Sequence, residues 1–214
     1  MRRFSPGPKS DSLCARYGIK ANEKIVLFMG TLYRFAGLDW FLQGMARIVR
    51  AHPDTRVVLV GGGEEESHLK GIARSAGIEN KFVFTGFIDY PELADHLRLA
   101  DIAINSFEPT LVTHCALPGK VLQYLGCGVP CVSTPLEGLR GMLGEEMGIL
   151  YRAAGEDFLH AVDHLLADER HRTEVGRAGR RAMEQLCQWD RCIEDFERAI
   201  VRAIDRHKEM ALAK

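Results

Sequence analysis

The residue best placed to do chemistry in this sequence is Lys120, because of its neighbours in the stretch 114–130 (HCALPGKVLQYLGCGVP). Pro118 and Gly119 suit the first turn of a helix, and the apolar residues after them recur at helical spacing. A helix that begins near Pro118 directs free backbone N–H groups and the positive end of its dipole toward the lysine. This combination favours binding of an anion such as a phosphate. The alternative is an ordinary connection between a helix and a strand, with a solvated lysine.

Strands and helices alternate along the part of the chain that must position this lysine. Short apolar runs predict buried parallel strands at 24–30, 56–60, 81–85, 101–105, 130–133 and 148–151. Apolar residues three and four apart predict helices at 38–49, 64–76, 90–99 and 118–126. This alternation predicts an α/β fold: a doubly wound, Rossmann-like parallel sheet of about six strands in the order 3-2-1-4-5-6, with extra C-terminal helices.

Two loops meet at the point where such a sheet reverses its strand order, which is where ligands bind. They are Gly30–Gly37 (GTLYRFAG), after the first strand, and Asn105–Leu117 (NSFEPTLVTHCAL), after the fourth. The second is long for a connection between a strand and a helix, which favours a functional role. The helix that carries Lys120 begins where this loop ends, so the predicted anion site falls at the switch point.

The ends of the chain show a different pattern. Only helices are predicted from Asp157 onward, at 158–166 and 172–186, followed by an amphipathic helix along which Trp189, Ile193, Phe196, Ile200 and Ile204 recur. We divide the chain into a linker and entry segment (1–22, with a helical turn at 12–17), a Rossmann-like domain (23–187), the C-terminal amphipathic helix (188–209) and a tail (210–214). The amphipathic helix either closes this domain or docks on another one.

The composition excludes several classes of protein. The 214 residues are 46% hydrophobic and carry a formal net charge of −1, so a general nucleic-acid or anionic-membrane binder is not expected. The six cysteines form no CxxC pair and no zinc motif, which favours reduced thiols and a cytoplasmic protein. No apolar run is long enough to span a membrane, and Met1-Arg2-Arg3 does not precede a hydrophobic signal core.

Several common motifs are absent or unfavourable. The first strand is not followed by GxGxxG, and Lys120 is not part of a Walker motif, which disfavours a dinucleotide-dependent dehydrogenase and an ATPase. The glycines at 61–63 precede three glutamates that would repel a phosphate, so we expect a turn there. His114 and Cys115 are adjacent, but neighbours in sequence point apart and no third residue orients them, so a Cys/His nucleophile is not expected.

In their order and spacing, these segments resemble the C-terminal, donor-binding half of a GT-B glycosyltransferase, most similar to family 4 of the retaining enzymes. The resemblance covers nearly the whole chain and is carried by FSP, KIVLFMGTLYRFAGLDWFL, VVLVGGGEEESHLKGIA, KFVFTGFIDYPELADHLRLADIAIN, LPGKVLQYLGCGVPCVST and QW. It implies transfer of a sugar from a nucleotide-diphosphate sugar, with retention at the anomeric carbon and without a metal or other cofactor. The QW segment resembles the start of a last helix that crosses back to the N-terminal half.

The resemblance also implies roles for individual residues. Lys120 and Arg34 would be the catalytic cations that stabilise the leaving diphosphate. Gly86 and Phe87 match the loop that holds the base, although a plain strand end is the alternative. The nucleotide-sugar-binding positions implied in this way are Gly30, Thr31, Gly86, Phe87, Leu117, Pro118, Gly119 and Gln123.

Four positions depart from the family pattern. Thr31 and Ala36 stand where the family usually has an arginine and a lysine, and Arg34 either substitutes for these cations or is simply solvated. Cys115 and Gln123 stand where it has paired glutamates. Gln123 either contacts a ribose hydroxyl or lies on the helix surface, whereas Cys115 cannot replace a carboxylate and is interpreted as a small buried hydrophobe.

These observations leave three hypotheses. In the first, the chain is the donor-binding half of a retaining glycosyltransferase acting on a glycan, lipid or small molecule. Because Met1 falls within the resemblance to the linker, we expect the acceptor-binding half to be missing or encoded separately, and any peripheral membrane association to come through it. The isolated chain would then transfer little sugar. The alternatives are a non-catalytic partner with a degraded site, and a nucleotide-sugar epimerase of GT-B-like fold.

Overall fold

The computed structural model describes residues 3–212, apart from the side chains of 189–191 and 208–212. A six-stranded parallel sheet runs through it in the order β3-β2-β1-β4-β5-β6. The strands are β1 (Lys24–Met29), β2 (Thr55–Val60), β3 (Phe82–Phe84), β4 (Ile102–Asn105), β5 (Cys131–Ser133) and β6 (Ile149–Tyr151). The predicted strand order and the Rossmann-like α/β class are therefore confirmed.

The helices lie close to the predicted ranges. They are α1 (Asp11–Tyr17), α2 (Leu38–Ala51), α3 (Glu66–Ser75), α4 (Leu93–Arg98), α5 (Leu111–His114), α6 (Gly119–Gly126), α7 (Glu137–Arg140), α8 (Glu156–Ala167), α9 (Glu169–Leu186) and α10 (Trp189–Leu212). Short 3₁₀ turns occur at Arg34–Ala36, Glu79–Lys81, Tyr90–Glu92 and Glu145–Met147. The predicted loop at 105–117 contains α5, a single turn that forms because Thr110 and Thr113 make a reciprocal capping box.

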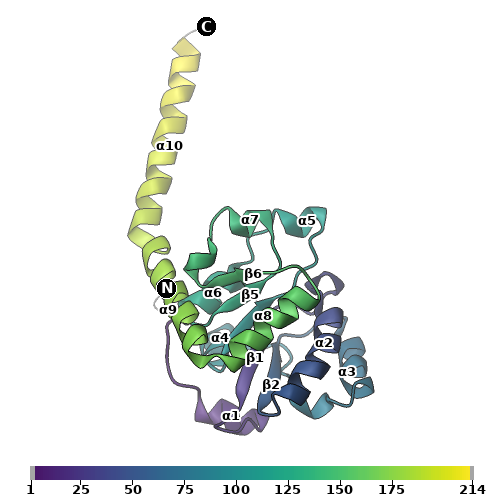
Figure 1. The fold of residues 1–214 in the computed structure, drawn as a ribbon. Helices are drawn as coiled ribbons and strands as arrows, with labels where there is room; N and C mark the ends of the chain where they lie inside the picture. The colour runs from purple at the N-terminus through teal and green to yellow at the C-terminus, as the bar shows by residue number, and fades with distance from the viewer. Residues whose placement is uncertain (1–2, 213–214) are drawn as a thin grey trace.

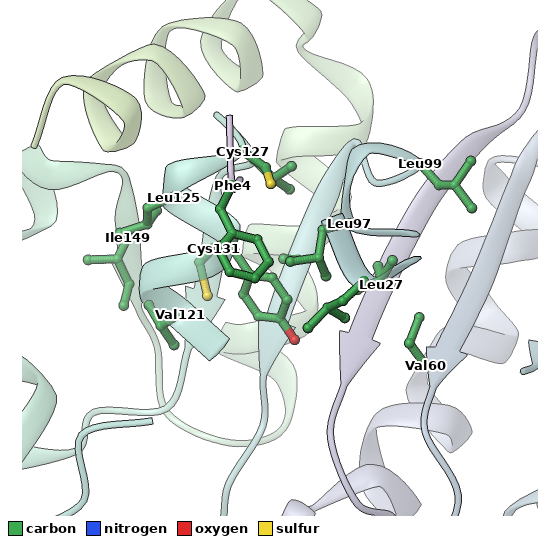
Figure 2. Packing of buried hydrophobic residues seen from close by; sticks show 14 of the residues in the cluster. Phe4, Leu27, Val60, Leu97, Leu99, Val121, Leu125, Cys127, Cys131 and Ile149 are labelled. Carbon is green, nitrogen blue, oxygen red and sulfur yellow. The ribbon is translucent and has the colours of Figure 1, made fainter. Parts of the chain in front are cut away.

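The strand β1 lies at the centre of the sheet and pairs with β2 on one side and β4 on the other. Its side chains alternate between the two faces. Ile25 and Leu27 belong to one hydrophobic cluster, which α4, α6 and α9 cover. Val26 and Phe28 belong to the other, which α2, α3 and α8 cover. Figure 2 shows the first of these clusters, around Leu27. A continuous apolar run suits this strand because both of its faces are buried.

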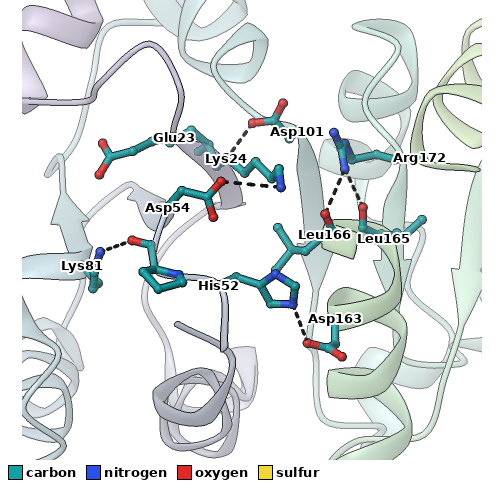
Figure 3. A network of polar contacts seen from close by, with 12 residues as sticks. Glu23, Lys24, His52, Asp54, Lys81, Asp101, Asp163, Leu165, Leu166 and Arg172 are labelled. Atoms are coloured by element: carbon teal, nitrogen blue, oxygen red, sulfur yellow. Dashed lines mark hydrogen bonds and ion pairs between the residues drawn. The ribbon is translucent and has the colours of Figure 1, made fainter. Parts of the chain in front are cut away.

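The amino ends of the strands are bordered by paired polar groups (Figure 3). Lys24 and Asp54, at the starts of β1 and β2, form an ion pair at 3.6 Å. The Asp101 carboxylate, just before β4, accepts a hydrogen bond from the Ile25 backbone N–H at 2.7 Å and pairs with Lys9 at 2.6 Å. This edge of the sheet is fixed by interactions within the chain.

The two ends of the chain behave differently. The N-terminal segment packs on the domain, since Phe4 is buried in the core and Arg98 donates to the backbone carbonyl of Ser5 at 2.9 Å. The helix α10 projects away from the domain (Figure 1), and every described side chain from 192 to 207 is exposed. The predicted role of Trp189 lies outside the described side chains. None of the helices within residues 3–212 has the length and apolar character that a membrane crossing requires.

Candidate functional site

Three loops are tied together at the carboxyl edge of the sheet. The backbone N–H of Leu32, after β1, donates to the carbonyl of Gly62, after β2, at 3.0 Å. The Ser106 hydroxyl, after β4, donates to the carbonyl of Ala36 at 2.6 Å, and the Glu108 N–H donates to that of Phe35 at 2.9 Å. The loop at 30–37 is therefore held between the other two, as the predicted switch point requires.

The glycines at 61–63 allow this close approach. A Cβ atom on Gly61 would overlap the carbonyl oxygen of Gly30, and one on Gly63 would overlap the backbone of Leu32. Gly61 also has a φ of 130°, which disfavours other residues. The predicted turn is thus a contact point between two loops, and it fixes the position of Gly30.

Two adjoining pockets form a cleft over these loops, and both are lined by Met29, Gly30 and Thr31. One pocket, of about 300 Å³, extends toward the start of α6 and is also lined by Tyr33, Phe35, Phe107, Pro118, Gly119 and Lys120. The other, of about 230 Å³, extends over β2 and is also lined by Val60, Gly61, Phe87, Ile88, Tyr90 and Leu93. The lining of both parts is mainly apolar, and one of them contains a cation, Lys120.

Lys120 is the central side chain of the first pocket. Its exposed fraction is 8%, and its ammonium group lies 4.0 Å from the ring centroid of Phe28 and 3.9 Å from that of Phe107. These are cation–π contacts, which partly offset the loss of water. Among the described residues, the Nζ atom has no hydrogen-bond acceptor and no acidic partner. A solvated lysine, the alternative considered from sequence, is therefore wrong.

Burial lowers the pKa of Lys120 from 10.5 to about 7, because the charged form loses its hydration. A buried ammonium without an anion is costly, since buried charges are normally paired. Binding of a phosphate oxygen would supply the missing acceptor and favour the charged form.

The helix α6 carries this lysine because of its N-terminal sequence. Pro118, in extended conformation, precedes the first helical residue, Gly119, and makes no side-chain cap. The first backbone N–H groups of the helix therefore have no partner within it. At the other side of the helix, the buried Tyr124 hydroxyl accepts a hydrogen bond from the Met29 N–H at 2.7 Å. This bond ties α6 to the end of β1, so that lysine and loop face the same cleft.

The structure brings most of the predicted contact residues together. Those that line the cleft are Gly30, Thr31, Phe87, Pro118, Gly119 and Lys120. Gly86 lies beside it, because its carbonyl accepts from the Gly61 N–H at 3.1 Å. Phe87 lines the pocket over β2, and its side chain is 75% exposed.

Three other predicted site residues lie apart from the cleft lining. Arg34 is exposed at the start of a 3₁₀ turn, Leu117 is exposed, and Gln123 is half-buried in α6. Their roles toward a ligand stay predictions. Cys115 is exposed, so its interpretation as a buried hydrophobe is wrong. The reason is that the loop around α5 lies over the surface instead of entering the core.

Sequence reasoning missed the aromatic side chains that enclose the lysine. Phe28 looked like an ordinary core residue of β1, and Phe107 an ordinary loop residue. Phe107 also packs edge-on against Phe35, which stacks on Tyr33, with ring centroids 5.4 and 5.3 Å apart. The only local signal was that Tyr33 and Phe35 in one loop and Phe107 in the other lie in two loops that the sheet topology brings together.

A possible metal cluster occurs nearby. Within the described residues, ligand atoms of Asp39, Glu65 and His68 lie within 4.8 Å of one another. His68 Nε2 is hydrogen-bonded to Asp39 Oδ2 at 2.7 Å, which accounts for the grouping. Asp39 and Glu65 also lie at the starts of α2 and α3, where the positive ends of the helix dipoles oppose a cation. We therefore assign no metal to this cluster.

Comparisons with known proteins show the family of this chain. A family model described as "Glycosyl transferases group 1" matches residues 23–168. A D-inositol 3-phosphate glycosyltransferase of Kineococcus radiotolerans is 30% identical over 84% of this chain and 45% of its own length. A GDP-mannose-dependent alpha-(1-6)-phosphatidylinositol monomannoside mannosyltransferase of Mycolicibacterium smegmatis is 29% identical over 87% of this chain and 50% of its own length. The chain thus spans about half the length of the curated relatives it matches.

Solved structures show the same fold. The C-terminal domain of the group 1 glycosyltransferase LpcC from Francisella tularensis matches with a TM-score of 0.73, covering 88% of this chain and 97% of that one at 18% identity. HepE from Anabaena, solved in complex with UDP, matches with a TM-score of 0.81, covering 94% of this chain and 55% of that one at 15% identity. Both likenesses concern the fold.

Proposed function

The chain belongs to the group 1 glycosyltransferases, and we propose that it is the donor-binding part of a retaining enzyme that uses a nucleotide-diphosphate sugar. The buried, unpaired ammonium of Lys120 beside the first turn of α6 is the observation that carries this proposal. In such a donor, the diphosphate is the group that carries the negative charge.

The two parts of the cleft fit two parts of such a donor. The diphosphate would lie in the pocket of Lys120, near the backbone of Gly30 and the N-terminal amides of α6. The base would lie in the adjoining pocket, against the exposed ring of Phe87. The distance between them is short, because both pockets are lined by Met29, Gly30 and Thr31.

Catalysis would rest on stabilising the leaving group. When the bond between the anomeric carbon and the diphosphate oxygen breaks, its electron pair stays on the diphosphate, and negative charge develops there. A cation and helix-terminal amides already in place stabilise that charge without reorganisation. We propose that Lys120 and these amides act without a metal ion, and that Gln123 approaches a ribose hydroxyl.

The acceptor site would come from a second part or partner, since the chain spans about half of its relatives' length. The exposed helix α10 offers a surface for it. Ile193, Phe196, Ile200 and Ile204 recur at helical spacing, and each is at least 39% exposed. We propose that the acceptor-binding half packs against this apolar stripe.

The proposal is tested by calorimetric titration of the chain with UDP, GDP and ADP separately. We expect one of them to bind, and Lys120→Met to weaken its binding at least tenfold, with no effect of added EDTA. The matched control is Arg47→Ala, an exposed cation of α2 outside the cleft, which pairs with Glu156. Absence of binding by all three nucleotides at millimolar concentration, or equal binding by both variants, would contradict the proposal.

A further inference from the structure

A further pocket lies at the opposite, amino edge of the sheet. It has a volume of about 450 Å³ and lies between the N-terminal segment, the starts of β4 and β5, and α9. Pro6, Ala100 and Pro130 give it an apolar floor, whereas α9 lines it with arginines at 172, 177, 180 and 181. None of these residues takes part in the donor cleft.

We propose that this pocket is a second anion site, which binds a phosphate group through Arg177 and Arg181. The argument depends on which charges in the pocket already have partners within the chain. It is independent of the proposed donor site, which lies at the other end of the strands.

Three of the six charged groups in the lining already have partners within the chain. The carboxylate of Asp101 is neutralised by Lys9 at 2.6 Å. Arg180 donates to the carbonyls of Phe4 and Gly126 at 3.0 and 2.9 Å, and pairs with Glu184. These groups shape the wall of the pocket and leave little charge for a ligand.

Only one nitrogen of the Arg172 guanidinium donates hydrogen bonds within the described residues. Its side chain is buried, with an exposed fraction of 8%, and Nη1 donates to the carbonyl of Leu165 at 2.7 Å at the end of α8 (Figure 3). It therefore supplies a fixed positive charge in the wall.

Arg177 and Arg181 remain. Neither makes an ion pair or a side-chain hydrogen bond within the described residues. They are four residues apart on α9, so their side chains share one face of the helix and repel each other. Glu169 is the one acidic residue of the described lining without an ion pair. A phosphate would relieve the repulsion, and its oxygens match the fork of a guanidinium.

The helix that presents these arginines is held firmly. A Cβ atom on Gly176 would overlap the carbonyl oxygen of Gly128, and one on Gly179 would press on the side chain of Leu125. Such close packing of α9 on the turn before β5 fixes the arginine backbones relative to the pocket floor. The side chains of Arg177 and Arg181 are exposed and extend from this fixed backbone.

The test uses inorganic pyrophosphate and the full chain carrying Lys120→Met, which removes the cation of the donor cleft. We expect saturable binding in calorimetry, and NMR shifts of the arginine Nε–H signals of 177 and 181. Arg177→Ala/Arg181→Ala in this background should weaken binding at least tenfold. The matched control is Arg74→Ala/Arg170→Ala, which removes the same charge from exposed positions outside the pocket.

A second arm identifies the source of the phosphate. Vesicles of phosphatidylcholine with phosphatidylglycerol are compared with phosphatidylcholine alone in co-sedimentation. Binding to anionic vesicles that is lost in Arg177→Ala/Arg181→Ala, without binding of pyrophosphate, supports a lipid headgroup as the ligand. The proposal is overturned if Arg177→Ala/Arg181→Ala and Arg74→Ala/Arg170→Ala bind a probe equally well. It is also overturned if neither probe binds. If the chain proves not to bind a nucleotide at Lys120, this test of the second anion site is unaffected.

Discussion

The two edges of the sheet differ in whether their charged side chains are paired. At the amino edge, Lys24 pairs with Asp54, and the Asp101 carboxylate satisfies both Lys9 and a backbone N–H of β1. At the carboxyl edge, Lys120 is buried between two phenyl rings without any acceptor among the described residues. Paired groups stabilise the fold, whereas a buried unpaired charge lowers stability, which motivates the proposed anionic ligand.

This contrast also separates two kinds of residue that look alike in sequence. Lys24 begins a strand and Lys120 begins a helix, and each is a lone cation beside an apolar run. The first meets an aspartate from the neighbouring strand, but the second meets only aromatic rings. The difference predicts opposite effects of substitution on stability and on ligand binding.

The largest effect is expected from Lys120→Met, which keeps the length of the side chain and removes its charge. Because a buried ammonium without a partner is destabilising, the free energy of unfolding at pH 6 should rise by about 2 kcal/mol or more. Nucleotide binding should fall at the same time. Urea denaturation measures the first change. A drop in stability would show that Lys120 has a partner and that the two edges do not differ.

The pH dependence should also distinguish the two edges. The pKa of Lys120 is about 7 in the folded chain and 10.5 as the ordinary value, so the unfolded chain binds more protons between these values. Stability of the wild type relative to Lys120→Met should therefore rise with pH through this window and be constant below it. Denaturation series at pH 6, 8 and 10 measure this difference, and a flat profile would contradict the assignment.

Ligand affinity should change in the opposite direction over the same range. A bound diphosphate favours the ammonium, so affinity should fall by up to about tenfold per pH unit above pH 7, with uptake of a proton on binding. Calorimetry in two buffers of different ionisation enthalpy measures the proton uptake. Affinity that is equal at pH 6.5 and 8.5 would show that the charge of Lys120 is not used.

At the amino edge, Asp101→Ala should destabilise the chain without affecting the cleft. It leaves the N–H of Ile25 and the ammonium of Lys9 without their shared acceptor, which should lower the free energy of unfolding by about 1–3 kcal/mol. Under conditions in which the variant is fully folded, its affinity for the nucleotide should be unchanged, since the carboxylate lies at the far ends of the strands. Weakened nucleotide binding in the folded variant would show that the two edges are coupled.

The smallest effect is expected from Tyr124→Phe, which removes only the hydroxyl that joins α6 to β1. Loss of the acceptor for the Met29 N–H should cost about 1 kcal/mol of stability. Because this bond aligns Lys120 with the loop at Gly30, nucleotide affinity should fall a few-fold while its pH dependence stays the same. Thermal denaturation and calorimetry measure the two effects. An unchanged nucleotide affinity would show that the Tyr124 hydroxyl does not position Lys120.

The sequence by itself determined the strands, their order and the place of the cleft. The run 25–29 is apolar at every position because both faces of β1 are buried, and such runs are local patterns that can be recognised without a structure. Pro118 and Gly119 likewise marked the start of α6, because capping depends on nearby residues. The position of Lys120 at the switch point followed from these elements and the general topology of doubly wound sheets.

Only the tertiary structure decided the environment of each side chain in the site. Phe28 and Phe107 enclose Lys120 although they are far from it in sequence, and nothing local to Lys120 distinguishes such rings from a carboxylate partner. The exposure of Cys115 and the position of Arg34 outside the cleft depend on how two loops cross. Local spacing sets secondary structure, whereas the pairing or isolation of a charge depends on contacts between distant segments.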